Sequence, residues 1–218
     1  MSGWLDWADA VAFTVGHQSI KWADLVGNLL GLATVGLALR RSILTWPVQI
    51  AGCVLLFSVS WSVDLKGNAM RQVALAVLAA YGWAQWLRGR RERAEVPVRW
   101  AGARERAVLV GALAVGTLAF AGVLQWWLGS WNPILDSYIF VGSLGATYAQ
   151  ARGWVEFWFV WIAVDLVGVP LAATHGLVVS GAVYGIYLAM CLAGVRDWAR
   201  RARPTAMAAA GVGEVARV

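Results

Sequence analysis

Seven long apolar runs, separated by short polar or basic segments, dominate the chain. A helix rises about 1.5 Å per residue, so it needs about 20 apolar residues to cross a bilayer core of roughly 30 Å. The runs near this length are residues 20–39, 43–63, 69–88, 107–128, 133–151, 154–174 and 177–197. They are apolar on all sides and rich in Ala and Leu. The pattern therefore predicts an all-α integral membrane protein with seven transmembrane helices.

The composition supports this class and argues against others. Of the 218 residues, 60% are hydrophobic and only 14% are charged, whereas a soluble domain has about a quarter of its residues charged. Trp occurs 15 times, and Trp concentrates at membrane–water interfaces. A soluble enzyme, a DNA-binding domain and a disordered chain all fit poorly. Cys53 and Cys191 lie within apolar runs and indicate neither a disulfide framework nor a metal site.

The net charge of +6 comes from basic residues at the ends of the runs rather than along one helix face. This placement is typical of membrane orientation, not of nucleic-acid binding. If the N-terminus is outside, 15 of the 18 Lys and Arg residues fall on the inner side, and only Lys21, Lys66 and Arg71 fall outside. We therefore expect a multi-pass membrane protein without a nucleic-acid partner, its N-terminus outside and its C-terminus in the cytoplasm.

The seven helices divide into three, one and three, so that both triplets enter the membrane in the same direction as a parallel pseudo-repeat. Two short internal sequence similarities support this repeat: residues 26–34 resemble residues 141–147, and Tyr81-Gly82 resembles Tyr184-Gly185. A repeat of this kind places a substrate site between the two bundles, near the membrane midplane. The predicted segments are an extracellular segment 1–19 with an interfacial helix or frayed leader over 4–17, a first bundle 20–88, a basic cytoplasmic loop 89–106, a linker helix 107–128, a second bundle 129–198 and a cytoplasmic tail 199–218.

Polar side chains at membrane depth are costly, so they mark a pathway unless another role explains them. Trp158 and Trp161 share one helix face, where they form an aromatic wall for a planar ligand. We expect Asp136 and Asp165 to orient other groups, although Asp136 alternatively faces water or caps a helix. The Thr147 hydroxyl alternatively bonds back to its own helix. The candidate substrate-binding residues are Asn28, Trp46, Gln49, Gln72, Thr147, Trp158, Trp161 and Tyr184.

Other residues receive simpler interpretations. Trp83 and Trp86 precede the basic loop and are predicted to anchor a helix at the interface. His17 and His175 lie at outer helix ends, and the sequence contains no catalytic or nucleotide-binding motif, so we expect no enzyme, no metal site and no cofactor. No Lys or Arg lies near the middle of a predicted helix. The pocket therefore suits an uncharged planar molecule with hydroxyls better than a phosphorylated one.

Three motifs are more specific than the composition. They are Thr45-Trp46-Pro47-Val48-Gln49; Gln72 followed by Tyr81-Gly82-Trp83-Ala84-Gln85-Trp86; and the set of Glu156, Trp158, Trp161 and Asp165. They resemble motifs of the Pnu family of bacterial vitamin transporters (PnuC type), in which the third reads E-N-W-x-x-W-x-x-x-D. The resemblance covers roughly residues 20–200 and implies a 3+1+3 helix arrangement similar to the SWEET sugar transporters. It also implies facilitated diffusion of an unphosphorylated vitamin across a bacterial inner membrane, with trapping inside the cell by a kinase.

Two longer sequence segments, residues 40–49 and 131–158, look most like the riboflavin-carrying branch of this family, called PnuX or RibM. Asn68, Thr147 and Phe157 stand where the nicotinamide riboside type usually has Asp, Gln and Asn, so a charge and two amides are lost. A neutral flavin needs an aromatic platform with amides and hydroxyls, whereas a pyridinium cation favours a carboxylate or a cation–π wall. Riboflavin is thus the expected substrate; nicotinamide riboside, thiamine, and a non-transporting membrane scaffold or sensor are the alternatives. The family also suggests a homo-oligomer.

Overall fold

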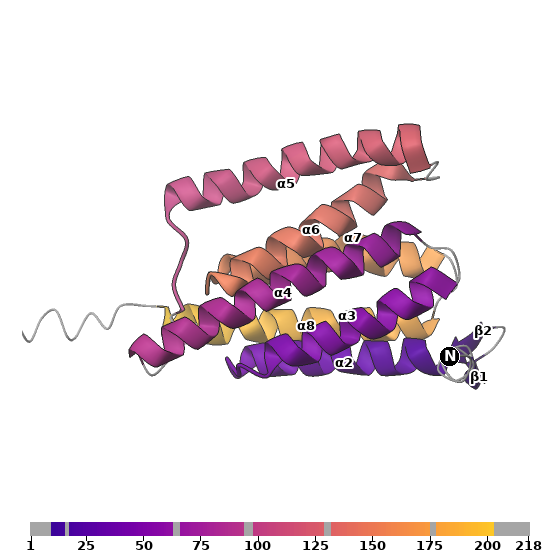
Figure 1. Cartoon of the computed structure of the whole chain (residues 1–218), viewed down its shortest axis with the longest axis horizontal. Coiled ribbons are helices and arrows are strands. Elements are labelled where there is room, and N and C mark those ends of the chain that lie inside the picture. The colour runs from indigo at the N-terminus through magenta and orange to yellow at the C-terminus, as the bar shows by residue number, and fades with distance from the viewer. Residues whose placement is uncertain are drawn as a thin grey trace, which may run out of the picture.

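The computed structural model describes residues 10–15, 18–62, 66–93, 98–128, 132–174 and 178–202, and these form seven α-helices, a π-helical turn and a two-stranded hairpin (Figure 1). In chain order the elements are β1 (Val11–Val15), β2 (Gln18–Lys21), α2 (Trp22–Leu39), α3 (Thr45–Ser62), α4 (Lys66–Arg93), α5 (Ala103–Val123), η1 (Leu124–Leu128), α6 (Pro133–Ala151), α7 (Glu156–Thr174) and α8 (Val178–Arg201). Each of the seven predicted helices is confirmed, because each apolar run coincides with one of these α-helices.

Two helices are longer than the apolar pattern predicts. Helix α4 continues to Arg93 and α8 to Arg201, both beyond the last apolar residues and into basic segments. Arg is a good helix former, and its long side chain reaches water while the backbone stays helical. The predicted loop over 89–106 is therefore too long at both ends, and its described non-helical part is the segment 98–102.

The predicted interfacial helix near the N-terminus is wrong for Val11–Val15, which form strand β1. This strand pairs antiparallel with β2, and Val15 lies opposite Gln18. Val and Thr are β-branched and favour strands over helices. The backbone N–H of Trp22 donates to the carbonyl of Ala10 at 3.0 Å, which joins the hairpin to the start of α2. The remainder of the predicted helix, residues 4–9 and 16–17, lies outside the described residues.

The helices pack in two sequential groups. Helix α3 packs between α2 and α4, and α7 packs between α6 and α8. The groups meet where α4 packs on α6 and where α2 packs on α8. Helix α5 lies along one side of the bundle and packs on α6 (Figure 1).

Helix α5 has the surface of a helix that faces lipid. By length and composition alone, one described stretch, Ala103–Trp126, is long and apolar enough to cross a membrane, and two shorter apolar helices cover Leu25–Leu39 and Thr45–Trp61. Only 17% of an 18-residue apolar window within this stretch is buried, and Val115 and Leu118 are each 68% exposed. The core helix of a soluble protein would instead bury such side chains.

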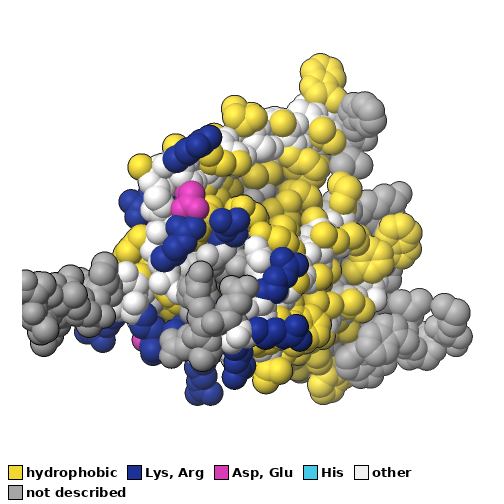
Figure 2. Space-filling model, turned by 60° about the vertical axis from the view of Figure 1, so that its left-hand side comes forward, with side chains coloured by type: hydrophobic (Ala, Val, Ile, Leu, Met, Phe, Trp, Pro, Cys, Tyr) yellow, Lys and Arg dark blue, Asp and Glu magenta, His cyan; other side chains and the backbone are white. Residues whose placement is uncertain are grey.

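Most of the described arginines gather at one end of the helices, which we call the basic end. Figure 2 shows them clustered there, next to a broad apolar surface. This end contains the α2–α3 connection, the end of α4, the start of α5, the α6–α7 turn and the end of α8. Its arginines are Arg40, Arg41, Arg88, Arg90, Arg91, Arg99, Arg104, Arg106, Arg152, Arg196, Arg200 and Arg201. Lys21 and Arg71 lie towards the opposite end, as the charge pattern predicts.

Candidate functional site

Five aromatic side chains from four helices pack together near the basic end, and we call them the aromatic cluster. They are Trp46 on α3, Trp86 on α4, Phe157 and Trp158 on α7, and Trp198 on α8, and each is at most 2% exposed. Ring centroids lie 5.1 Å apart for Trp46–Trp86 and 5.9 Å apart for Trp158–Trp198, both edge to face, which is a favoured ring geometry. Trp86 and Trp198 lie 6.3 Å apart and connect the two groups of helices.

Two glycines allow this packing. The indole of Trp46 lies against Gly82 of α4, and the indole of Trp158 lies against Gly194 of α8. At either glycine an added Cβ atom would overlap the ring, so only glycine admits the tryptophan. Residues four apart share a helix face, and Trp86 and Trp198 each follow their glycine by four residues. The two groups of helices therefore carry the same Trp-on-Gly arrangement.

Several polar atoms of the cluster are buried without a partner. Trp86 donates its Nε1–H to the backbone carbonyl of Gln150 at 3.2 Å. The Nε1–H groups of Trp46, Trp158 and Trp198 find no acceptor among the described residues, although all three are buried. A buried donor without an acceptor costs about 1–3 kcal/mol. These indoles are thus held by ring packing rather than by hydrogen bonds.

The cluster contains two of the predicted site residues and changes the assignment of others. Trp46 and Trp158 are brought together in it, and Trp161 packs against it while remaining partly exposed. Trp86, predicted as an interfacial anchor, is instead buried in the centre; that prediction is wrong for Trp86, whereas Trp83 is 36% exposed. Phe157, which stands where the nicotinamide riboside type usually has Asn, packs within the cluster, its ring centroid 4.2 Å from that of Trp158 and 4.8 Å from that of Trp198.

The remaining predicted substrate-binding residues are spread over five helices. Gln72 on α4 is 3% exposed, and Gln49 on α3 is partly buried with an Oε1 that has no hydrogen-bond partner in the described part. Asn28 on α2 is exposed, and its backbone carbonyl accepts a hydrogen bond from Tyr187 Oη at 3.4 Å. The Tyr184 side chain lies outside the described residues, so its prediction stays untested.

The buried hydroxyls and the two aspartates have local partners. Thr147 Oγ1 donates to the carbonyl of Ser143 at 2.8 Å, and Ser143 Oγ donates to Ile139 at 2.6 Å, so both bond back to their own helix. Asp136 lies in the first turn of α6, where a carboxylate is favoured by the helix dipole. Asp165 on α7 is 5% exposed, and its Oδ2 lies 4.0 Å from the thiol of Cys191 on α8.

The segment 98–102 attaches α5 to the α6–α7 turn. The backbone of Arg99 makes two hydrogen bonds to this turn: its N–H donates to the carbonyl of Gly153, and its carbonyl accepts from the N–H of Val155, each at 3.0 Å. Glu156 accepts from the backbone N–H of Ala101 at 3.0 Å and from Arg106 Nε at 2.7 Å. The glutamate of the third motif therefore holds the start of α5 against the start of α7.

A second ion pair reinforces this connection. The two terminal guanidinium nitrogens of Arg99 donate to the two carboxylate oxygens of Glu105, Nη1 to Oε2 at 2.6 Å and Nη2 to Oε1 at 2.7 Å. The hydrogen bond with Glu105 raises the pKa of Arg99 above its ordinary value. Arg99 also lies 5.6 Å from the centre of the Trp154 ring, where a cation–π attraction adds to the contact.

Comparison with known proteins decides the family. The model of the nicotinamide mononucleotide transporter family matches residues 21–200, which include every residue of the aromatic cluster. The chain belongs to this family. Within the nicotinamide mononucleotide transporter family it is similar to the riboflavin/roseoflavin transporter RibM of Streptomyces davaonensis, with 48% identity over 91% of this chain and 94% of that protein.

Two further relatives are more distant. The nicotinamide riboside transporter PnuC of Escherichia coli is 25% identical over 86% of this chain and 89% of its own. The crystal structure of the Vitamin B3 transporter PnuC has the same fold, with a TM-score of 0.68 and 24% identity over 83% of this chain and 82% of that chain. This member of the nicotinamide mononucleotide transporter family is thus an all-α integral membrane transporter and not an enzyme.

The Trp-on-Gly packing predicts that replacing the contacted glycine by alanine destabilises the protein, the opposite of the usual effect in a helix. Gly→Ala in a helix interior is usually stabilising by up to about 1 kcal/mol. At Gly194 the methyl group meets the Trp158 ring, so Gly194→Ala should destabilise the protein by about 1–3 kcal/mol. Gly185→Ala, on the same helix with no described atom within 4 Å, is the matched control. Thermal unfolding in detergent measures both; equal melting temperatures for the two variants would refute the packing.

The connection between α5 and α7 predicts a selective effect of Glu156. Glu156→Gln removes the charge that pairs with Arg106 and should lower the free energy of unfolding by about 1–2 kcal/mol, because Glu156 is only 12% exposed. Asp197→Asn is the control, since the Asp197–Arg201 pair is exposed on both sides and should contribute little. Denaturant unfolding compares them, and an equal loss for both variants would contradict the proposed connection.

Proposed function

We propose that the protein imports riboflavin across the bacterial cytoplasmic membrane by facilitated diffusion, and that phosphorylation inside the cell retains the vitamin. The observation that carries this proposal is the 48% identity, over nearly all of both chains, with a protein named as a riboflavin/roseoflavin transporter. The basic end faces the cytoplasm in this proposal, because cytoplasmic ends of transmembrane helices are enriched in Arg and Lys. The N-terminus is then outside and the C-terminus inside.

In our proposal the helices form a 3+1+3 parallel pseudo-repeat, with α5 as the linker. The contacts support this, because exchanging α2, α3 and α4 for α6, α7 and α8 maps each packed pair among these six helices onto another packed pair. Gly27 of α2 receives Leu56 of α3, and its counterpart Gly142 of α6 receives Val164 of α7. Contact with a tryptophan ring also favours Gly194, rather than Gly185 from the sequence similarity, as the counterpart of Gly82.

The aromatic cluster closes the cytoplasmic end of the pathway in this mechanism. Trp46 and Trp86 belong to the first bundle, and Phe157, Trp158 and Trp198 belong to the second. Separation of the bundles at the Trp86–Trp198 contact would open a passage without breaking either Trp-on-Gly pair. Each bundle would then move as a unit, which is the usual form of alternating access in repeat-built transporters.

The residues one turn deeper than the cluster suit the substrate. Gln49 follows Trp46 by three residues and Trp161 follows Trp158 by three, so each shares a face with its cluster tryptophan. Trp161 offers a ring that remains partly exposed, and Gln49 offers an amide oxygen with no partner among the described groups. We assign stacking on the flavin ring to Trp161 and a polar contact to Gln49, while Trp158 positions Trp161.

A neutral pair favours riboflavin over a cationic vitamin. Asn68 Nδ2 donates to Ser60 Oγ at 2.6 Å, between α4 and α3, at the position where the nicotinamide riboside type usually carries Asp. Loss of that charge removes a carboxylate that would attract a pyridinium cation. Nicotinamide riboside is the second candidate, because the more distant relatives are transporters of that vitamin.

Uptake of labelled riboflavin by cells that lack their own flavin transporter tests the proposal. Trp161→Ala should raise the riboflavin concentration for half-maximal uptake about 5- to 150-fold, since stacking contributes about 1–3 kcal/mol. Trp161→Phe keeps an aromatic ring and should restore part of the loss. Trp126→Ala is the matched control because Trp126 is 83% exposed at the end of the linker helix. Uptake of nicotinamide riboside instead of riboflavin would overturn the substrate, and normal uptake by Trp161→Ala would overturn the site.

The dependence of uptake on membrane potential is a second, independent test that distinguishes neutral riboflavin from cationic nicotinamide riboside. Moving one charge across the membrane gains or costs about 2.3 kcal/mol per 100 mV. Riboflavin is neutral, so its initial uptake rate should stay nearly constant when an ionophore collapses the potential. A severalfold fall in that rate would indicate a charged substrate or a coupled ion and contradict simple facilitated diffusion.

A further inference from the structure

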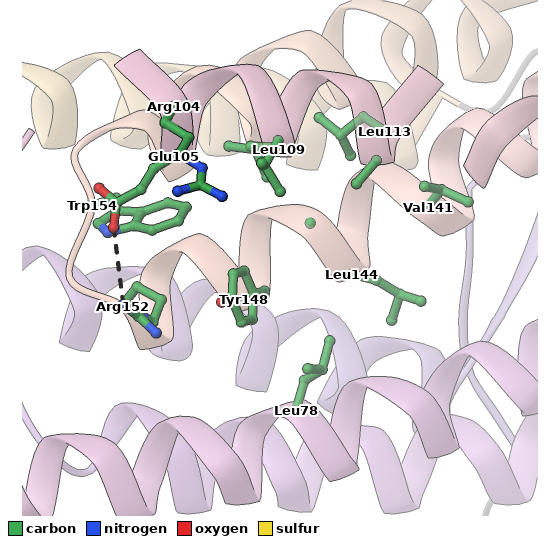
Figure 3. A pocket seen from close by; sticks show the side chains of 13 residues that line it. Leu78, Arg104, Glu105, Leu109, Leu113, Val141, Leu144, Tyr148, Arg152 and Trp154 are labelled. Carbon is green, nitrogen blue, oxygen red and sulfur yellow. Dashed lines mark ion pairs between the residues drawn. The ribbon is translucent and has the colours of Figure 1, made fainter. Parts of the chain in front are cut away.

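A cavity of about 540 Å³ lies between α4, α5 and α6, outside the proposed transport pathway (Figure 3). It arises because α5 packs on α6 and stands away from α4 (Figure 1). Most of its wall is aliphatic, and the side chains come from all three helices. The principal apolar lining residues are Leu78, Val108, Leu109, Leu113, Val141 and Leu144.

The polar groups of this cavity lie together at the basic end. In Figure 3 the Arg104 side chain extends from the first turn of α5 into the cavity, beside the Trp154 ring. No carboxylate of the described residues forms an ion pair with Arg104. Arg152 lies across the cavity. Its Nη2 is 3.9 Å from Glu105 Oε1, a distance at the limit of an ion pair. Glu105 already accepts two short hydrogen bonds from Arg99, so the mouth keeps a positive charge.

The shape and charge of this cavity match one kind of molecule in a membrane. Val108 is 63% exposed, so the cavity opens to the hydrocarbon around α5. A free anion would use only Arg104 and Arg152 and leave the aliphatic wall uncovered. An apolar helix of a second copy would cover the wall and leave the two guanidinium groups without an anion. A phospholipid with an anionic headgroup satisfies both parts.

We propose that this cavity binds an anionic phospholipid from the leaflet at the basic end. The headgroup phosphate lies between Arg104 and Arg152, where guanidinium groups donate charge-assisted hydrogen bonds to its oxygens. One acyl chain lies along the aliphatic wall between α5 and α4. The lipid thereby fills the space that α5 leaves open and stabilises the position of the linker helix.

Native mass spectrometry and thermal unfolding of the full-length protein test this site. The probe is phosphatidylglycerol added to protein in a neutral detergent, with phosphatidylcholine as the neutral reference. Wild-type protein should retain phosphatidylglycerol preferentially, and its melting temperature should rise more than with phosphatidylcholine. Arg104→Gln combined with Arg152→Gln should weaken retention about tenfold or more. Arg90→Gln combined with Arg200→Gln removes two arginines of the basic end that do not line the cavity, and should leave retention unchanged.

A second variant tests the acyl-chain half of the site. Val108→Trp narrows the aliphatic part while keeping both arginines, so it should also reduce retention of phosphatidylglycerol. Size-exclusion profiles like that of the wild type establish that each variant is folded.

Four results would overturn the proposal. One is equal loss of retention in the two double variants, which would mean general surface attraction. A second is equal stabilisation by inorganic phosphate, which would mean a small-anion site. The others are equal retention of both lipids by the wild type, and an oligomer in which cross-links from α5 show a second copy covering the cavity.

Discussion

Two tryptophans pack closely against neighbouring helices because the residue that each contacts is glycine, and this contact constrains how the helices of each group fit together. Trp46 on Gly82 fixes α3 against α4, and Trp158 on Gly194 fixes α7 against α8. The tryptophan four residues after each glycine, Trp86 or Trp198, then faces the other bundle. Close packing within each bundle, with ring contacts such as Trp86–Trp198 and Tyr81–Tyr148 between the bundles, is compatible with the alternating access proposed above.

The charged residues of the basic end act on a different part of the molecule. Glu156 holds the start of α5 through Ala101 and Arg106, so α5 is attached to the start of α7. Along the rest of its length α5 is largely exposed, and its apolar surface needs lipid. The cavity with Arg104 and Arg152 lies where this loosely packed helix meets the first bundle. In the proposed arrangement, lipid and protein together position α5, while the Trp-on-Gly pairs hold each group of helices.

The helices could be predicted from the sequence because membrane thickness and run length leave little choice. The extension of α4 to Arg93 could not, since hydropathy measures where the apolar core ends and not where the helix ends. The hairpin at Val11–Val15 was missed because small apolar residues beside tryptophans are compatible with either structure. The place of Trp86 before the basic loop predicts an interfacial anchor, and the equal spacing of Gly82–Trp86 and Gly194–Trp198 does not by itself show that the two tryptophans meet. Such a pairing between distant helices becomes visible only when the two glycines are seen under the two indoles.

The distance between the bundles at the basic end tests the central claim most directly. Spin labels at Arg90 on α4 and Arg200 on α8, in a chain whose Cys53 and Cys191 are replaced by Ala, report this distance by pulsed electron resonance. The account predicts two distances whose populations change when riboflavin is added, one with Trp86 and Trp198 in contact and a longer one with the bundles apart. A single distance that stays constant while the same labelled protein transports riboflavin would contradict it.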